Sequence, residues 1–240
     1  MDGKIELFTL LFNLKNMKIG ILLSGCGVYD GAEIHEAVFS LLAVEEEGHE
    51  PVCISINKTQ HHVINHLNGE EMQENRNMLI ESARIARGEV IEINNVESID
   101  ALIIPGGFGS AKNFTKWAFS GPDGMILEEV KNLILKLNSE KKPIVALCVS
   151  PVVIAKAMQE STTTPCLTIG SSEEKSPYDI NSFIEGLNKT GANTSMKNIN
   201  EIEIDYKNKI ITAPCYMMEA SIKDIRTNIQ NAIKAIKELI

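Results

Sequence analysis

The sequence predicts an α/β protein in which a mostly parallel sheet carries helices on both faces. Short, almost wholly apolar runs alternate along the chain with stretches that repeat their apolar residues at helical spacing, and this alternation is typical of such sheets. No linker, internal repeat or low-complexity tract interrupts the pattern. The 240 residues suit one large domain or two small ones, and we expect a single domain over residues 17–240.

The first half of the chain predicts three strands and two helices. Met17–Ser24 is a near-continuous apolar run, as expected of a strand buried on both faces, and Ala32–Glu47 repeats apolar residues at helical spacing. Gly88 ends the second helix, because glycine is favoured just beyond a helix C-terminus. The other elements are a strand over Pro51–Ile56, a helix over Met78–Arg87 and a strand over Asp100–Pro105.

A polar, histidine-bearing segment separates the second strand from the second helix. It covers residues 57–77 and is longer than the usual connection of a few residues, and such loops tend to be functional or mobile. His62 and His66 would share a face if the segment were helical, but spacing alone is weak evidence for a metal site. We therefore expect no metal.

The second half of the chain begins with the strand Pro143–Cys148 and continues into an apolar helix that ends near Met158. Pro151 is a suitable first residue for that helix, because the first turn needs no backbone donor there. The remaining elements are a short strand Leu167–Gly170, a helix Ser176–Leu187, a C-terminal hairpin of Ile202–Tyr206 and Lys209–Ala213, and a final helix Met217–Glu238.

Charge and hydropathy argue against two classes of partner. The chain has 23 basic and 32 acidic side chains, a net charge of −9, whereas binding to a nucleic-acid backbone depends on basic clusters. No apolar run approaches the roughly 18 residues that span a bilayer. We therefore expect neither a nucleic acid nor a membrane as a partner.

The cysteines and the first residues bear on the cellular setting. The five cysteines are odd in number and show neither a CxxC pair nor zinc-site spacing, which indicates free thiols and a reducing, cytoplasmic location. Residues 1–16 lack the cleavage site of a signal peptide and the arginines of a transit peptide. We expect them to form an N-terminal extension outside the core fold.

Three segments that carry chemically useful groups follow predicted strands. Glu33, His35 and Glu36 follow the first strand, a run of glycines follows the strand that ends at Pro105, and Cys148 ends the next strand. Ligands of open α/β sheets bind at the carboxyl ends of the strands. The sequence therefore predicts a site where these segments meet.

Cys148 has the surroundings of a nucleophile at a sharp strand-to-helix turn. Ala146 and Ser150 supply the small side chains that such a turn requires. The dipole of the following helix is expected to lower the thiol pKa, although a buried structural thiol is the plain alternative. Backbone N–H groups of Gly106 or Gly107 and of Val149 would form an oxyanion hole.

Four segments carry a family resemblance: SGCGVYDGAEIHEAV, VINHLNGEEMQENRNMLIESARIARGE, DALIIPGGFGSAKN and ALCVSP. They resemble the ElbB-type proteins, which are isoprenoid-biosynthesis proteins with an amidotransferase-like domain. These belong to the superfamily of PfpI and the Parkinson-disease deglycase, related to class I glutamine amidotransferases. The resemblance covers about residues 17–238. It implies a flavodoxin-like, doubly wound fold, a homodimer and a reactive elbow cysteine.

The resemblance also assigns roles to individual residues. The deglycase pattern G-A-E-x-x-E matches Gly31 to Glu36, so Glu36 would be the carboxyl partner of Cys148. Glu33 would be a second carboxylate nearby, and His35 a neighbour that either contacts the site or packs. The other expected pocket residues are Asn65 and His66 at the mouth, and Cys26 and Cys215 as thiols able to approach Cys148.

Two departures narrow the expected chemistry. All five histidines precede Cys148, whereas amidotransferases place their catalytic histidine after the cysteine. Val149 occupies the position where PfpI-type peptidases have a histidine. Neither a glutaminase nor a peptidase is therefore expected. The glycine spacing around Cys26 and the absence of a Walker lysine also argue against nucleotide binding.

We expect a cofactor-independent glyoxalase or deglycase that uses Cys148 and Glu36 on small reactive carbonyls such as glyoxal and methylglyoxal. The first alternative is a non-enzymatic sensor that signals through oxidation of Cys148, since a reactive thiolate serves that role as well. The second is an accessory protein linked to isoprenoid biosynthesis, which rests on the family name alone.

Overall fold

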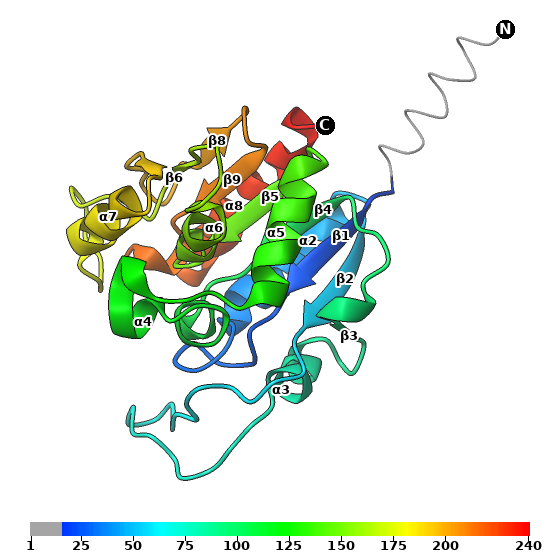
Figure 1. Ribbon diagram of the computed structural model, residues 1–240, viewed down its shortest axis with the longest axis vertical. Helices are drawn as coiled ribbons and strands as arrows, with labels where there is room; N and C mark the ends of the chain where they lie inside the picture. The colour runs from blue at the N-terminus through cyan, green and yellow to red at the C-terminus, as the bar shows by residue number, and fades with distance from the viewer. Residues whose placement is uncertain (1–15) are drawn as a thin grey trace, which may run out of the picture.

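A seven-stranded sheet forms the centre of the computed structural model, which describes residues 16–240 (Figure 1). The strand order is β3-β2-β1-β4-β5-β9-β8, and every neighbouring pair is parallel except β8 and β9. The strands are β1 (Lys18–Leu22), β2 (Glu50–Ser55), β3 (Ile91–Glu92), β4 (Ala101–Ile104), β5 (Ile144–Leu147), β8 (Glu203–Asp205) and β9 (Ile210–Ala213). The predicted extension over 1–16 lies, apart from its last residue, outside the described residues.

Helices cover both faces of the sheet. Helices α5 and α6 pack together in front of it in the view of Figure 1, and α2 and α8 pack together behind it. This is the flavodoxin-like arrangement that the family resemblance implies. The helices are α2 (Ile34–Glu46), α3 (Met78–Ile85), α4 (Trp117–Ser120), α5 (Glu128–Ser139), α6 (Pro151–Met158), α7 (Ile180–Lys189) and α8 (Ile222–Lys234).

The central strands supply the core. Every residue of β4, β5 and β9 is buried, as expected of parallel strands covered on both faces. The order of connections reverses at β1, which lies between β2 and β4. In open α/β sheets ligands bind at such a switch point, outside the carboxyl ends of the strands.

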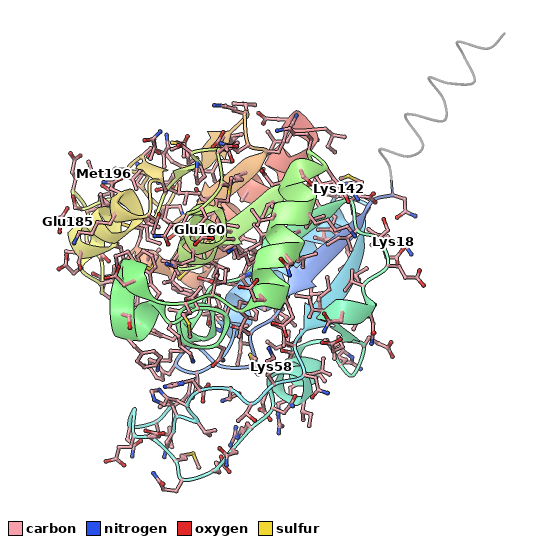
Figure 2. The ribbon with its side chains drawn as sticks, viewed as in Figure 1. Lys18, Lys58, Lys142, Glu160, Glu185 and Met196 are labelled. Atoms are coloured by element: carbon pink, nitrogen blue, oxygen red, sulfur yellow. The ribbon has the colours of Figure 1, made fainter. Side chains whose placement is uncertain are left out.

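A small excursion leaves the main sheet between α6 and β8. It contains the parallel pair β6 (Cys166–Leu167) and β7 (Asn193–Thr194), together with α7. Glu185 of α7 and Met196 mark its outer edge (Figure 2). The excursion lies beside the carboxyl end of β5 and contributes side chains to the site described below.

The polar segment 57–77 is an extended loop without a helix. Isolated bridges pair Thr59 with Asn77 and Ile64 with Glu71, so the segment doubles back on itself. The Lys58 ammonium, labelled in Figure 2, contacts the Glu129 carboxylate at 2.6 Å and joins the start of the loop to α5. His62 and His66 therefore do not share a helix face.

Most predicted elements are present, and the differences have local causes. The last helix begins at Ile222 rather than Met217, because Ser221 caps it by accepting the Asp224 N–H. The helix predicted from Ser176 begins at Ile180, where Asp179 is the N-cap. The sequence reading missed β3, α4, α5 and β7.

None of the helices within residues 16–240 combines the length and the apolar character that crossing a membrane would require.

Two glycines with almost equal positive φ angles allow a test of how tightly the turn after β4 is packed. Gly107 has φ +93°, and a Cβ there would lie 2.4 Å from both the Glu33 nitrogen and the Gly31 oxygen. Gly191 has φ +91° with no neighbour within 4 Å. Gly191→Ala should lower the free energy of unfolding by about 1 kcal/mol through backbone strain alone. Gly107→Ala should lower it by about 3 kcal/mol or more, because fixed backbone must also move.

Urea denaturation of both variants checks this difference. Equal losses of unfolding free energy in the two variants would contradict the close packing of the turn against the start of α2.

Candidate active site

Cys148 lies on the sharp turn between β5 and α6. Its φ of +58° is in the left-handed region, which non-glycine residues rarely adopt and which is common at functional sites. Its N–H donates to the Ala213 carbonyl at 2.9 Å, and the Ser150 hydroxyl donates to the Pro105 carbonyl at 2.7 Å. The turn predicted from the small residues around Cys148 is therefore present.

Glu36 is fully buried in the first turn of α2, beside Cys148. Its Oε2 accepts the Gly106 N–H at 2.8 Å, and its Oε1 accepts the Tyr216 N–H at 3.4 Å. The carboxyl group lies beside the Cys148 thiol, because a Cβ on Gly106 would be 2.6 Å from Glu36 Oε2 and 3.0 Å from the Cys148 sulfur. Burial, with the charge of nearby Glu33, raises the pKa of Glu36 to about 8. The carboxyl group therefore holds its proton at neutral pH.

The pKa of Cys148 shifts in the direction opposite to the prediction. Burial and the adjacent Glu36 carboxyl raise it, whereas the Val149 N–H lowers it by less. The expected effect of the α6 dipole is thus outweighed, because α6 begins only at Pro151 and the sulfur is almost completely removed from water. Cys148 is therefore not an isolated thiol of low pKa, and any proton transfer at its sulfur involves the adjacent Glu36 carboxyl.

Glu33 and His35 also lie at the site. The Glu33 carboxylate caps α2 by accepting the Glu36 N–H at 2.7 Å, and burial raises its pKa. His35 is half exposed, and its Nδ1 is 2.8 Å from the Tyr216 hydroxyl. Of the two possibilities for His35, the structure supports contact with the site, through Tyr216.

The three residues predicted to form the oxyanion hole surround Cys148, but their backbone N–H groups are not equally free to bind a substrate oxygen. The Gly106 N–H already donates to Glu36, so it is not free for a substrate oxygen. Gly107 and Val149 line the same pocket as Cys148. Gly106 has a steric role instead, since a Cβ there would lie 2.4 Å from the Cys148 Cβ and 2.6 Å from Glu36 Oε2.

A narrow, mostly apolar pocket leads to Cys148. Four aromatic residues in its wall were missed in the sequence reading. Phe108 and Tyr216 directly follow segments already singled out, so their position was a usable signal, whereas Tyr178 and Phe183 come from the excursion. The pocket is lined by Val28, Glu33, Gly107, Phe108, Cys148, Val149, Tyr178, Phe183, Tyr216 and Met217.

Of the six predicted pocket residues, Glu33 lines this pocket, whereas Cys215 lies next to Cys148 outside the lining. The other residues outside the lining are His35, Cys26, Asn65 and His66. Cys26 sits in the turn after β1, where burial and nearby Glu81 raise its pKa. The Asn65 Oδ1 accepts the Leu67 N–H and stabilises the long loop. His66 Nε2 accepts the Tyr29 N–H at 3.2 Å, and its Nδ1 lies 2.9 Å from the Ile64 carbonyl.

The loop histidines contact neighbouring side chains and are not arranged as a set of metal ligands. His61 Nδ1 lies 3.2 Å from the Lys116 ammonium, and its ring stacks on Phe119 with centroids 4.4 Å apart. Over residues 16–240, no group of three or more histidine, cysteine or acidic side chains is arranged to hold a metal ion.

Comparison with known proteins identifies relatives over nearly the whole chain. No family model matches it. The chain is 37% identical to the "ES1 protein homolog, mitochondrial" of Rattus norvegicus over 228 residues, which cover 92% of this chain and 84% of the relative. It is 36% identical to the human "Glutamine amidotransferase-like class 1 domain-containing protein 3, mitochondrial", over 92% of this chain and 83% of the relative.

These names correct one expectation. The cysteine content predicted a cytoplasmic location, but both relatives are named as mitochondrial proteins. That prediction is wrong, because free thiols indicate a reducing setting without identifying the compartment.

Solved structures agree with the sequence relatives. An isoprenoid biosynthesis protein with an amidotransferase-like domain from Ehrlichia chaffeensis is 33% identical, with a TM-score of 0.83 over 93% of this chain and all of that chain. Glyoxalase III from Candida albicans is 13% identical, with a TM-score of 0.57 over 91% of this chain and 97% of that chain, which shows a shared fold alone. The chain therefore belongs to the ElbB-type family of glutamine amidotransferase-like class 1 domain proteins, together with the ES1 proteins.

Proposed function

We propose that the protein is a cofactor-independent glyoxalase or deglycase that acts on small 2-oxoaldehydes. The observation that carries this proposal is the buried Glu36 carboxyl, with a pKa of about 8, beside the thiol that lines the pocket. A group with a pKa near the working pH both accepts and returns protons efficiently. The reaction needs a nucleophile and such a proton carrier.

In the first step, the Cys148 sulfur adds to the aldehyde carbon of the substrate. The reacting form of the pair holds a single proton, on the thiol. The Glu36 carboxylate takes this proton and passes it to the new alkoxide oxygen, which gives a neutral hemithioacetal and leaves Glu36 as the carboxylate. Gly107 and Val149 line the pocket, and their backbone N–H groups would stabilise the developing charge on the oxygen.

In the second step, the Glu36 carboxylate removes the remaining hydrogen of that carbon as a proton and returns it to the adjacent carbon, while the hydroxyl proton of the hemithioacetal passes to the neighbouring carbonyl oxygen. This converts the hemithioacetal into a thioester of a 2-hydroxy acid. Water then cleaves the thioester, releasing glycolate or lactate and restoring the thiol. No electrons leave the substrate, because one carbon is oxidised as its neighbour is reduced. Deglycation of aldehyde adducts on amines would use the same groups.

Two further observations support this chemistry over the amidotransferase reaction in the family name. All five histidines precede Cys148 in the sequence, whereas amidotransferases place the catalytic histidine after the cysteine. His35 lies at the site, but its Nδ1 contacts the Tyr216 hydroxyl. Glyoxalase III of Candida albicans shares the fold, although function resides in the site and not in the fold.

Conversion of methylglyoxal to lactate, without glutathione or metal, tests the proposal. Wild-type protein should turn over, Cys148→Ala should be inactive, and Glu36→Gln should lose about 10² to 10⁴ in rate because the proton carrier is gone. Cys26→Ala is the matched control, since Cys26 does not line the pocket, and should keep the wild-type rate. Wild-type protein without activity would refute the proposal.

The pH dependence of Cys148 alkylation tests whether the Cys148 thiol keeps its proton at neutral pH. Because burial and the adjacent Glu36 carboxyl raise the pKa of Cys148 above its ordinary value of 9.0, the reactive thiolate should be scarce from pH 6 to pH 8, and the rate with iodoacetamide should still be rising at pH 9. Peptide mass spectrometry resolves each cysteine. Cys53, whose pKa burial raises to about 11, is an internal reference that should stay unreactive. A rate that is already constant below pH 7 would contradict the raised pKa of Cys148.

We also propose that the protein forms a homodimer through α2. Ile34, Val38 and Leu42 are spaced four residues apart and are each more than a third exposed, so they form an apolar stripe on one face of the helix. A second copy is the fitting occupant, because a two-fold axis sets such a stripe against itself.

Sedimentation velocity tests the dimer at micromolar concentration. Wild-type protein should sediment as a dimer, and Val38→Glu should sediment as a monomer because a charge enters the apolar contact. Met125→Glu, at an exposed apolar residue away from α2, should remain dimeric. A monomeric wild-type protein would contradict the assignment.

A further inference from the structure

A second cysteine leaves the sheet beside Cys148. Cys148 follows β5 and Cys215 follows the neighbouring parallel strand β9, whose Ala213 is in register with Leu147. The Cys148 N–H donates to the Ala213 carbonyl at 2.9 Å. The two thiols therefore lie at the same edge of the sheet, on adjacent strands.

The backbone of Cys215 is held in a fixed conformation. Its φ is +45°, and its N–H donates to Asn228 Oδ1 at 3.0 Å. Asn228 is fully buried and is itself held by its Nδ2, which donates to the Glu201 carbonyl at 2.8 Å. A non-glycine residue keeps such a conformation only when its surroundings impose it.

The same carboxyl group contacts both cysteine segments. Glu36 lies beside the Cys148 thiol and accepts the N–H of Tyr216, the residue after Cys215. The two sulfurs thus share one small, buried environment around Glu36.

Access to the two thiols differs. Cys148 lines the pocket, whereas Cys215 has no exposed surface and is absent from the pocket wall. A small solute therefore reaches Cys148 first, and Cys215 can react only with the oxidised or modified form of Cys148.

We propose that Cys148 and Cys215 form a peroxide-reducing dithiol, with Cys148 as the attacking sulfur and Cys215 as the resolving sulfur. The Cys148 thiolate attacks a peroxide oxygen, the O–O bond breaks, and the leaving oxygen takes a proton from Glu36 to become water. Cys148 is then a sulfenic acid. The Cys215 sulfur attacks it, an S–S bond forms, and a second water leaves with the proton of Cys215. Two thiols are oxidised to a disulfide as one hydrogen peroxide is reduced to two waters.

The disulfide would place the protein in an inactive state, because it consumes the sulfur required for the aldehyde reaction. It would also protect Cys148 from further oxidation to sulfinic acid, which is not reversed by thiols. This inference does not depend on the proposed glyoxalase activity, since it concerns only the two sulfurs and Glu36.

Treatment with equimolar hydrogen peroxide, followed by non-reducing peptide mass spectrometry, tests the inference. Wild-type protein should give a cross-linked peptide pair containing Cys148 and Cys215, lighter by two hydrogens, and little adduct with dimedone, a reagent for sulfenic acids. Cys215→Ser should lose the cross-link and accumulate the dimedone adduct on Cys148. Cys26→Ser should behave as wild type.

Two outcomes would overturn the inference: equal dimedone labelling of Cys148 in wild type and Cys215→Ser without any cross-link, or a cross-link that joins Cys148 to Cys26. Circular dichroism of Cys215→Ser establishes that the variant is folded. Methylglyoxal turnover, measured separately, shows whether the aldehyde reaction holds, so failure of one proposal is distinguishable from failure of the other.

Discussion

The burial of the Glu36 carboxyl group is the constraint on which the site depends. A carboxyl group removed from water needs hydrogen-bond partners or a proton, and Glu36 has both, from the backbone at Gly106 and Tyr216 and from its raised pKa. These contacts join α2 to the segments that follow β4 and β9. The glycine at position 106 is part of the same constraint, because a side chain there would occupy the space in which sulfur and carboxyl meet.

The sequence pattern predicted the sheet, most helices and the turn at Cys148, whereas the pairing of Glu36 with Cys148 was implied by the family resemblance. Apolar runs identify buried strands well, and the small residues around Cys148 identify its turn. It missed α5, although Val130, Ile134 and Leu137 are its buried residues and their spacing is helical. The helical spacing of these residues was therefore a usable signal for α5.

Other features were not predictable from local pattern. The engagement of the Gly106 N–H by Glu36 joins residues that are 70 positions apart, and the pocket aromatics Tyr178 and Phe183 come from an excursion whose place beside β5 depends on the whole fold. The pKa of Cys148 was misjudged because the helix dipole is visible in a sequence, whereas the extent of desolvation is not. Asn65 and His66 stabilise the long loop instead of entering the pocket wall, because that loop doubles back on itself.

The contact between Glu36 and Tyr216 spans 180 residues of chain, and this separation has a consequence for how the reactive thiol arises during folding. Contacts between distant residues form late, since closing a long loop costs entropy before it returns stability. A chain that has been synthesised only through α6 already contains Cys148, yet it lacks β9 and the segment that completes the surroundings of Glu36. Full proton coupling at the sulfur is therefore acquired only when the last strand docks, and a ribosome-bound or truncated chain would carry an ordinary cysteine.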